Sequence, residues 1–207
     1  MLCAIAMVHD EMPLLPLTLA NLLDQGVDRV LIAEHNSTDG TLDWLRSAEK
    51  MDARISVMAH TTPAYNQAAV ISSLARLAVV LGATWILPFD CDEFWIAAHP
   101  SLRLADVLTS EGRTGIQAIR VRLENFAAPA DCDLFHLTDL SRFTHRFATS
   151  GPVTAPHDVS AFQNGVRAFA SCAYPDKLII RSTPRHARRS GCSHRAAHHR
   201  HRWRLGI

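Results

Sequence analysis

Three carboxylates follow an apolar run in the middle of the chain, in the segment Trp85-Ile-Leu-Pro-Phe-Asp-Cys-Asp-Glu-Phe94. The run predicts a buried strand, and Asp90, Asp92 and Glu93 stand where that strand ends. Because clustered carboxylates repel one another, they need a cation or hydrogen-bond donors to neutralise them. Oxygen ligands of this kind suit Mg²⁺ or Mn²⁺, which can in turn hold a diphosphate. The segment predicts a divalent-cation site, and the alternative is a solvated turn with helix-capping carboxylates.

Strands and helices alternate around this segment, and glycines such as Gly26 and Gly82 stand where helices should end. Strands are expected at 2–8, 27–33, 54–58, 84–89, 115–123 and 177–181, and helices at 13–24, 41–50, 66–81 and 102–108. This alternation predicts an α/β fold with a mostly parallel central sheet and right-handed crossovers. We expect one domain over residues 1–180, followed by a basic His/Arg-rich tail over 181–207.

Composition narrows the class of protein. With 207 residues, 48% hydrophobic and 20% charged, the chain can bury a sizeable core and is not predicted to be disordered. A formal net charge of +1 gives no general attraction to nucleic acid. The five cysteines are odd in number and form no C-x-x-C pair, which predicts reduced thiols and a cytoplasmic setting. No stretch is long enough for a transmembrane helix, and peripheral contact with the inner face of a membrane is left open.

Three segments together resemble glycosyltransferase family 2: Met7-Val-His-Asp-Glu-Met-Pro13, Glu34-His-Asn-Ser-Thr-Asp-Gly-Thr41 and the segment that ends at Phe94. The likeness is strongest to the branch with an N-x-S-x-D-G-T loop and a D-x-D-E-F box, and it covers the first half of the chain. It implies the GT-A fold, a Rossmann-like three-layer sandwich. It also implies transfer of a sugar from a nucleoside-diphosphate donor to an acceptor hydroxyl, with inversion, in surface polysaccharide or glycan synthesis.

The resemblance assigns roles in the acidic box. Asp92 would bind Mn²⁺ or Mg²⁺ directly. Asp90 would bind the metal through water or contact the donor's ribose or sugar. Glu93 would join the metal shell or cap the next element, and both options stay open. A divalent ion at this place would stabilise the charge that develops on a departing diphosphate.

The same resemblance assigns the nucleotide to two other loops. The base and ribose of the donor would lie against Asp39, Asn36 and the strand end at Glu34, because carboxylates accept hydrogen bonds from ribose hydroxyls and base N–H groups. Glu11 would face the same nucleotide. The alternatives are a plain Asx-type turn at Asp39 and a cap at Glu11 for the helix that begins near Pro13.

An inverting enzyme also needs a base that deprotonates the acceptor. No motif selects one, and the candidates are Asp131, Asp133, His136, His157 and Asp158. His194 resembles a Gly-x-His element of this branch and would contact metal or phosphate, or else be a solvated side chain. The acceptor class stays open between a glycan, a lipid-linked molecule and a protein.

Other functions compete with sugar transfer. A sugar-nucleotide pyrophosphorylase would carry a glycine-rich phosphate loop, which is missing between His9 and Pro13. A truncated, inactive transferase domain that binds nucleotide or a partner is the main alternative. Nucleic-acid binding through the tail is disfavoured, since the tail has one aromatic residue, Trp203. The tail would otherwise attract a diphosphate or acidic glycan, bind an anionic membrane, or be solvated.

Overall fold

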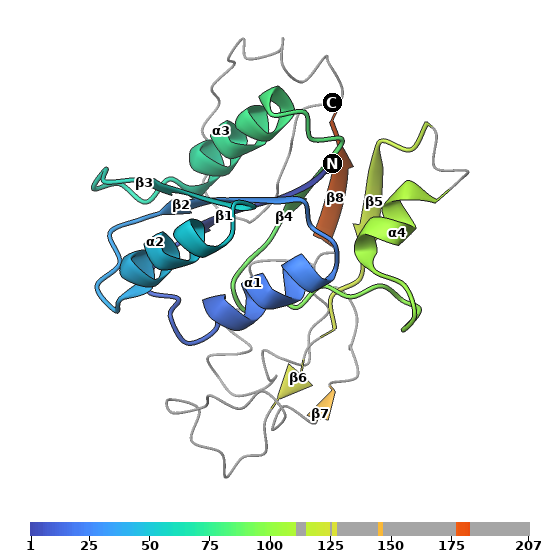
Figure 1. The fold of residues 1–207 in the computed structure, drawn as a ribbon, viewed down its shortest axis with the longest axis horizontal. Helices are drawn as coiled ribbons and strands as arrows, with labels where there is room; N and C mark the ends of the chain where they lie inside the picture. The colour runs from blue at the N-terminus through green and yellow to red at the C-terminus, as the bar shows by residue number, and fades with distance from the viewer. Residues whose placement is uncertain (111–114, 125, 128–144, 147–176, 183–207) are drawn as a thin grey trace, which may run out of the picture. The chain divides into compact units, whose positions relative to one another are not determined.

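The computed structural model describes residues 1–110, 115–124, 126–127, 145–146 and 177–182 (Figure 1). The chain divides into two compact units, one of Met1–Ala118 with Ile179–Ile207 and the other of Ile119–Leu178. The elements are β1 (Leu2–Val8), α1 (Leu15–Asp24), β2 (Arg29–Glu34), α2 (Thr41–Met51), β3 (Ile55–Ala59), α3 (Gln67–Val80), β4 (Trp85–Pro88), α4 (Leu104–Thr109), β5 (Ala118–Val121), β6 (Phe126–Ala127), β7 (His145–Arg146) and β8 (Lys177–Arg181).

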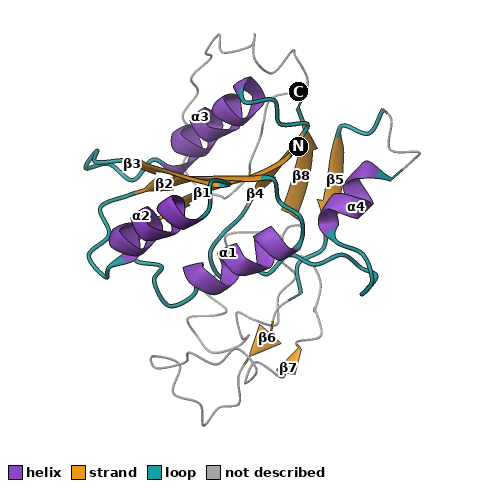
Figure 2. Cartoon of the chain, viewed as in Figure 1, coloured by secondary structure: helices purple, strands orange, loops and turns teal. Residues whose placement is uncertain are grey.

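The main sheet has the strand order β3-β2-β1-β4-β8-β5. Strand β1 pairs in parallel with β2 and with β4, and β2 pairs in parallel with β3. Strand β8 pairs antiparallel with β4. Helices α1 and α2 cover one face of the parallel strands and α3 covers the other, so this unit has three layers (Figure 2). The predicted α/β class with a mostly parallel sheet is therefore confirmed.

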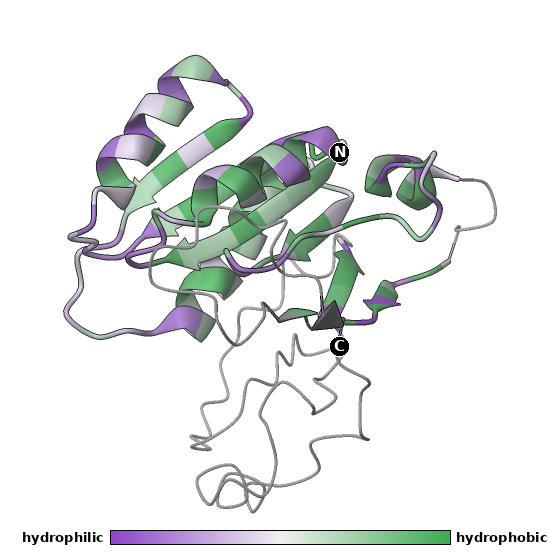
Figure 3. Ribbon diagram, turned by 90° about the horizontal axis from the view of Figure 1, so that it is seen from below, coloured by the Kyte–Doolittle hydropathy of each residue, from purple (hydrophilic) through white to green (hydrophobic). Residues whose placement is uncertain are grey.

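The core lies around β1, whose seven residues are all buried. A strand between two parallel neighbours, with helices over both faces, has no solvated side, which explains its uninterrupted apolar sequence. Helix α3 buries Ile71, Leu74, Ala75 and Ala78 in a cluster with β1 and β2. The strands of the sheet are accordingly coloured mainly as hydrophobic in Figure 3.

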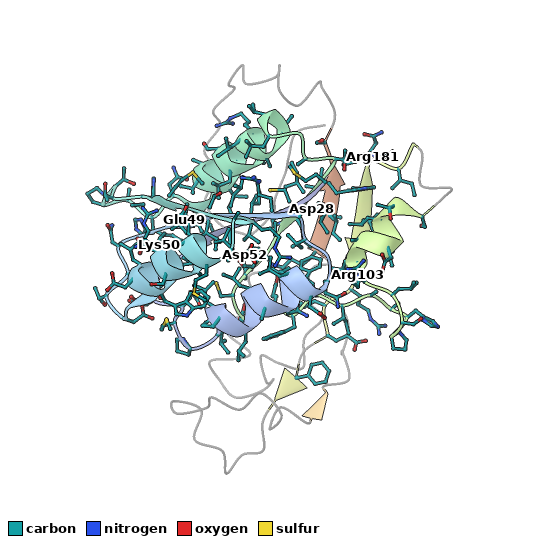
Figure 4. The ribbon with its side chains drawn as sticks, viewed as in Figure 1. Asp28, Glu49, Lys50, Asp52, Arg103 and Arg181 are labelled. Atoms are coloured by element: carbon teal, nitrogen blue, oxygen red, sulfur yellow. The ribbon has the colours of Figure 1, made fainter. Side chains whose placement is uncertain are left out.

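Strand β8 fixes the far side of β4. Arg181, labelled in Figure 4, comes from β8. It is in register with Trp85, and its guanidinium carbon lies 5.1 Å from the centroid of a Trp85 ring. A cation over an aromatic face is attracted by the ring quadrupole, so this contact adds to the ladder hydrogen bonds. It helps to hold β4, the strand that leads into the acidic box.

Element boundaries differ slightly from those expected. Helix α1 begins at Leu15 and not at Pro13, because the Glu11 carbonyl first accepts hydrogen bonds from Leu14 and Leu15 in a turn. The strand expected at 115–123 is shorter, Ala118–Val121. Among the described helices, none has both the length and the apolar character needed to span a bilayer.

Candidate functional site

The site residues gather where the order of the parallel strands reverses. From β1 the chain passes through β2 to β3, and then returns to the other side of β1 to form β4. In open α/β sheets, ligands bind at the carboxyl ends of the strands beside such a switch point. Glu11 follows β1 here, and Asp90 and Asp92 follow β4. The topology thus places both predicted carboxylate groups at the expected edge.

The pKa of Glu11 is changed by the other carboxylates at this edge of the sheet. Burial is the largest cause that raises the pKa of Glu11 to about 7, and the charges of Asp92, Asp90 and Asp39 contribute to that rise against a smaller opposing effect of His9. Like charges disfavour the ionised form of a carboxyl group only when they are near. The structure therefore brings Glu11 and the three predicted aspartates into one electrostatic cluster.

Asp90 to Glu93, called the acidic turn below, is closed by its own hydrogen bonds. The Glu93 N–H donates to the Asp90 carbonyl at 3.1 Å, and the Asp90 N–H donates to Glu93 Oε2 at 3.4 Å. Glu93 thus folds back on the turn, and the choice between the metal shell and a cap for the next element stays a prediction. Asp92 is exposed and Asp90 is partly buried. Asp92 is therefore the carboxylate of the turn most accessible to a ligand.

Cys91, between the two aspartates, is buried. Burial, together with the charges of Glu11, Asp90 and Asp92, raises the pKa of the Cys91 thiol well above its usual range. A thiol held protonated is a poor nucleophile and a poor metal ligand. Cys3 and Cys91, the cysteines that the structure describes, are both free.

Asp39 joins the loop after β1 to the start of α2. Its Oδ2 accepts a hydrogen bond from the Met12 N–H at 3.0 Å. Its Oδ1 accepts from the backbone N–H of Thr41 at 2.9 Å and from the Thr41 hydroxyl at 2.6 Å. Slight burial would raise the pKa of Asp39, but these hydrogen bonds outweigh it and lower the pKa. The Asx-type turn considered from the sequence is present, and because the side chain is also exposed, contact with a nucleoside stays a prediction.

Glu34 and Asn36 occupy different environments in the same loop. Glu34 is 2% exposed, and its Oε1 accepts a hydrogen bond from the Ser37 N–H at 2.6 Å. Asn36 is exposed, has a φ of 50°, and donates its side-chain amide to the Thr62 carbonyl at 3.4 Å. Glu34 therefore shapes the loop from inside, while Asn36 is accessible. A role in nucleotide binding stays a prediction for both.

Three histidines lie along this edge of the sheet, and the sequence did not lead us to predict them as site residues. His9, His35 and His60 each come directly after a parallel strand. His9 Nδ1 is 2.6 Å from the His35 carbonyl, and His35 Nδ1 is 3.1 Å from the His60 carbonyl. Because a carbonyl only accepts, these Nδ1 atoms donate. The signal was in the sequence, since parallel strands end at one edge and place the residues that follow them together.

Tyr65 connects these histidines to the acidic turn. Its ring meets His35 edge-on, with 5.4 Å between ring centroids. Burial raises the pKa of Tyr65, and the charges of Asp90, Glu11 and Cys91 add to the effect. The exposed Tyr65 ring therefore stands within the electrostatic reach of the acidic turn. Aromatic and imidazole rings beside a carboxylate cluster offer apolar faces and donors for a nucleoside.

The residues present fit a divalent cation such as Mn²⁺ or Mg²⁺. Asp90 and Asp92 supply hard oxygen donors, and their charges contribute, after burial, to the raised pKa of Glu11. Within the described part of the chain, no group of three or more His, Cys, Asp or Glu side chains forms a ready-made metal site. A cation held by two carboxylates completes its shell with water and substrate phosphate, as Mg²⁺ usually does.

Several sequence-based candidates lie outside the described residues. These are Asp131, Asp133, His136, His157, Asp158, His194 and all but the first two residues of the tail 181–207. The general base and the role of the tail therefore stay predictions, as does the domain boundary at residue 180.

Comparison with known proteins gives the following findings. No family model matches the chain, and no curated protein matches it in sequence. Among solved structures, it is similar to the mannosyltransferase PcManGT from Pyrobaculum calidifontis in complex with GDP-Man and Mn²⁺, with a TM-score of 0.47 and 18% identity over 60% of this chain and 35% of that one.

Two structures of TarS from S. aureus are also similar. TarS 1-349 has a TM-score of 0.35 and 16% identity over 45% of this chain and 28% of that one. TarS has a TM-score of 0.34 and 17% identity over 44% of this chain and 16% of that one. The chain thus spans about a third or less of the length of these three solved structures.

Proposed function

We propose that this chain is a metal-dependent glycosyltransferase that moves a sugar from a nucleoside-diphosphate donor to an acceptor hydroxyl with inversion, in surface polysaccharide or glycan synthesis. One observation carries the proposal. Carboxylates that follow β2 and β4 contribute together to the raised pKa of Glu11, which follows β1, at the switch point of the sheet. Such a concentration of negative charge beside a ligand-binding edge favours a cation and its bound phosphates.

The acidic turn takes the metal in this proposal. Asp92, the exposed member, is a direct ligand, and Asp90 binds the ion through water or contacts the donor sugar. When bound, the ion supplies charge stabilisation for the departing diphosphate. Glu93 holds the turn closed through its contact with the Asp90 N–H. The turn thus orients the donor phosphates and is preformed before the donor arrives.

The loops after β1 and β2 take the nucleoside. Asp39 and Asn36 are exposed and accept or donate hydrogen bonds to the ribose and base, while buried Glu34 fixes the loop that carries them. The pKa of Glu11 is raised by charges on both this loop and the acidic turn. We assign it to the nucleotide side of the site.

The reaction forms a bond between the acceptor oxygen and the anomeric carbon, and breaks the bond from that carbon to the diphosphate oxygen. The acceptor proton passes to a carboxylate or imidazole base, and the diphosphate leaves with the bonding electrons. The base comes from the candidates that lie outside the described residues. Attack opposite to the leaving group inverts the anomeric centre.

Nucleotide titration tests the donor site. We expect UDP or GDP to bind the wild-type chain more tightly with Mn²⁺ than with EDTA, as measured by isothermal titration calorimetry. Asp92→Asn removes one ligand charge and should abolish the difference between Mn²⁺ and EDTA. Asp24→Asn neutralises an exposed carboxylate at the end of α1, outside the site, and should leave it unchanged.

Turnover separates the enzyme from its inactive alternative. Incubation with a panel of UDP- and GDP-sugars and Mn²⁺, read as release of nucleoside diphosphate, should detect slow transfer to water or to an added acceptor. Metal-dependent binding with no release from any donor would favour a nucleotide-binding domain without turnover. Nucleotide affinity that is the same with Mn²⁺ as with EDTA would refute the metal-dependent mechanism.

A further inference from the structure

We infer that Thr18 and Asn21 of α1 are positioning residues that fix the acidic turn against the repulsion of its own carboxylates. The inference rests on the proposed function, since it assigns these two side chains a part in metal binding. Neither residue belongs to a segment that was predicted from the sequence to bind metal or nucleotide. Both face the chain that follows β4 from the middle of a helix that follows β1.

Thr18 bonds to the peptide group between the two predicted ligands. It is fully buried, and its hydroxyl donates to the Cys91 carbonyl, 73 residues away in the chain. The same hydroxyl lies 3.2 Å from the Leu14 carbonyl, which already accepts the backbone N–H groups of Leu17 and Thr18. A hydroxyl has one proton, so its donation goes to Cys91. The bond ties the backbone between Asp90 and Asp92 to α1.

Asn21 holds the other side of the acidic turn. Its Oδ1 accepts a hydrogen bond from the Trp95 N–H at 2.9 Å. Residues three apart on a helix project from one face, so Thr18 and Asn21 act on the turn from the same side. One helix face therefore bonds to the chain within the turn and two residues beyond it.

Glu11 lies in the turn that leads into α1. The Glu11 carbonyl accepts the N–H groups of Leu14 and Leu15 at 3.2 and 2.9 Å, which begins the helix. Helix α1 thus connects the turn that holds Glu11 to the acidic turn, because its start bonds to the Glu11 carbonyl and Thr18 and Asn21 bond to the chain after β4. This explains how carboxylates that repel one another stay close enough to raise the pKa of Glu11 before any cation is bound.

The consequence for function is preorganisation. Partners that orient metal ligands without touching the ion commonly alter metal affinity by about 10- to 100-fold when they are removed. Loss of the Thr18 hydroxyl leaves the Cys91 carbonyl without this donor and lets the like charges of Asp90 and Asp92 separate. We therefore expect weaker Mn²⁺ binding in protein that remains folded.

Mn²⁺ binding to matched variants tests the inference. Mn²⁺ is titrated into the full chain with UDP or GDP present, and free Mn²⁺ is read by electron paramagnetic resonance. Thr18→Val should bind Mn²⁺ about 10- to 100-fold more weakly, whereas Thr18→Ser, which keeps the hydroxyl, should stay close to wild type. Thr109→Val is the control, because the Thr109 hydroxyl bonds only within α4 among the described residues.

Asn21→Ala gives an independent test at a site that is only partly buried. We expect it to weaken Mn²⁺ binding about tenfold. Its control is Gln25→Ala, at the end of the same helix. The Gln25 Oε1 also accepts a backbone N–H, that of Leu104 at 3.2 Å, but it holds α4 and not the acidic turn. Gln25→Ala should lower the melting temperature and leave Mn²⁺ affinity unchanged.

The outcomes separate the two proposals. A wild-type chain that binds no Mn²⁺ with either nucleotide overturns the proposed function and this inference together. Wild-type Mn²⁺ binding with unchanged affinity in folded Thr18→Val overturns the positioning role alone, as does an equal loss in Thr18→Ser. If Thr18→Val does not fold, the inference is tested by comparing the Mn²⁺ affinities of Asn21→Ala and Gln25→Ala. Equal Mn²⁺ affinity in that pair also overturns the inference.

Discussion

Glu11 and Asp92 come from segments 81 residues apart in the sequence, yet the charge of Asp92 contributes to the raised pKa of Glu11 after the larger effect of burial. They follow β1 and β4, which pair side by side in the sheet. The relationship between these two carboxylates is the basis for the electrostatic predictions below.

Replacing Glu11 by Gln should stabilise the metal-free protein above pH 7. The pKa of Glu11 is raised from an ordinary value of 4.5 to about 7 in the folded protein, so the folded state holds the proton more tightly than the unfolded state. The free energy of unfolding therefore falls as pH rises from about 4.5 to about 7. Above that range the ionised Glu11 carboxylate has its full destabilising effect. Because Glu11 is partly exposed and water screens its charge, we expect a gain of about 1 kcal/mol.

Urea denaturation at pH 4 and pH 8 in EDTA measures this gain. The difference between Glu11→Gln and wild type should be present at pH 8 and nearly absent at pH 4. Glu49→Gln is a suitable contrast. Hydrogen bonds from the Val57 N–H and Arg46 lower the pKa of Glu49, so its removal should destabilise at pH 8. An equal effect of Glu11→Gln at both pH values would contradict the prediction.

Mn²⁺ binding should strengthen with pH between 6 and 8 and release protons. A cation near Glu11 favours its ionised form, so binding displaces the proton that Glu11 retains at about neutral pH. Calorimetric titrations at pH 6.5 in two buffers of different ionisation enthalpy measure that release. In Glu11→Gln the proton release should be smaller. Equal release in the variant would mean that the proton comes from another group.

Asp39→Ala should destabilise the fold by about 1–2 kcal/mol, because it removes the acceptor for the Met12 and Thr41 N–H groups. The lowered pKa of Asp39 means that its contribution is present above the unfolded pKa and is lost as pH falls through the folded value. Urea denaturation at pH 7 and pH 3 tests both statements. Asp39→Asn keeps one oxygen acceptor and should destabilise less than Asp39→Ala at pH 7. Equal destabilisation by Asp39→Ala at both pH values would contradict a contribution from the ionised carboxylate.

Gly26→Ala should destabilise more than Gly82→Ala. Both glycines have positive φ angles, 83° and 88°, where a side chain adds strain of about 1 kcal/mol. An added Cβ at Gly26 would meet the Cβ of Ala105 at 2.7 Å, whereas nothing lies within 4 Å at Gly82. Overpacking adds about 1–3 kcal/mol at Gly26. Melting temperatures measured side by side test the contact of the α1–β2 turn with α4, and equal shifts would show that α4 moves away freely.

Several features of the fold could be predicted from local sequence. Strand β1 was predicted because its apolar run stops at the polar residues that follow Val8, and α3 because its apolar residues fall on one helical face and Gly82 ends it. The strand at Lys177–Arg181 was predicted with its observed limits. Its antiparallel pairing with β4 was not, because pairing partners are chosen by long-range packing and leave no periodic signal in either strand.

The sequence alone determined which carboxylates stand at strand ends, since the change from apolar run to Asp90 and Asp92 is a local pattern. It left open whether the Asp39 loop, the acidic turn and Glu11 meet, and it gave no sign that Thr18 or Asn21 contacts Cys91 or Trp95. Only the tertiary structure decided these points. The order of the strands sets which strand ends are neighbours, and the face that α1 turns toward β4 sets which of its polar side chains are buried against the acidic turn.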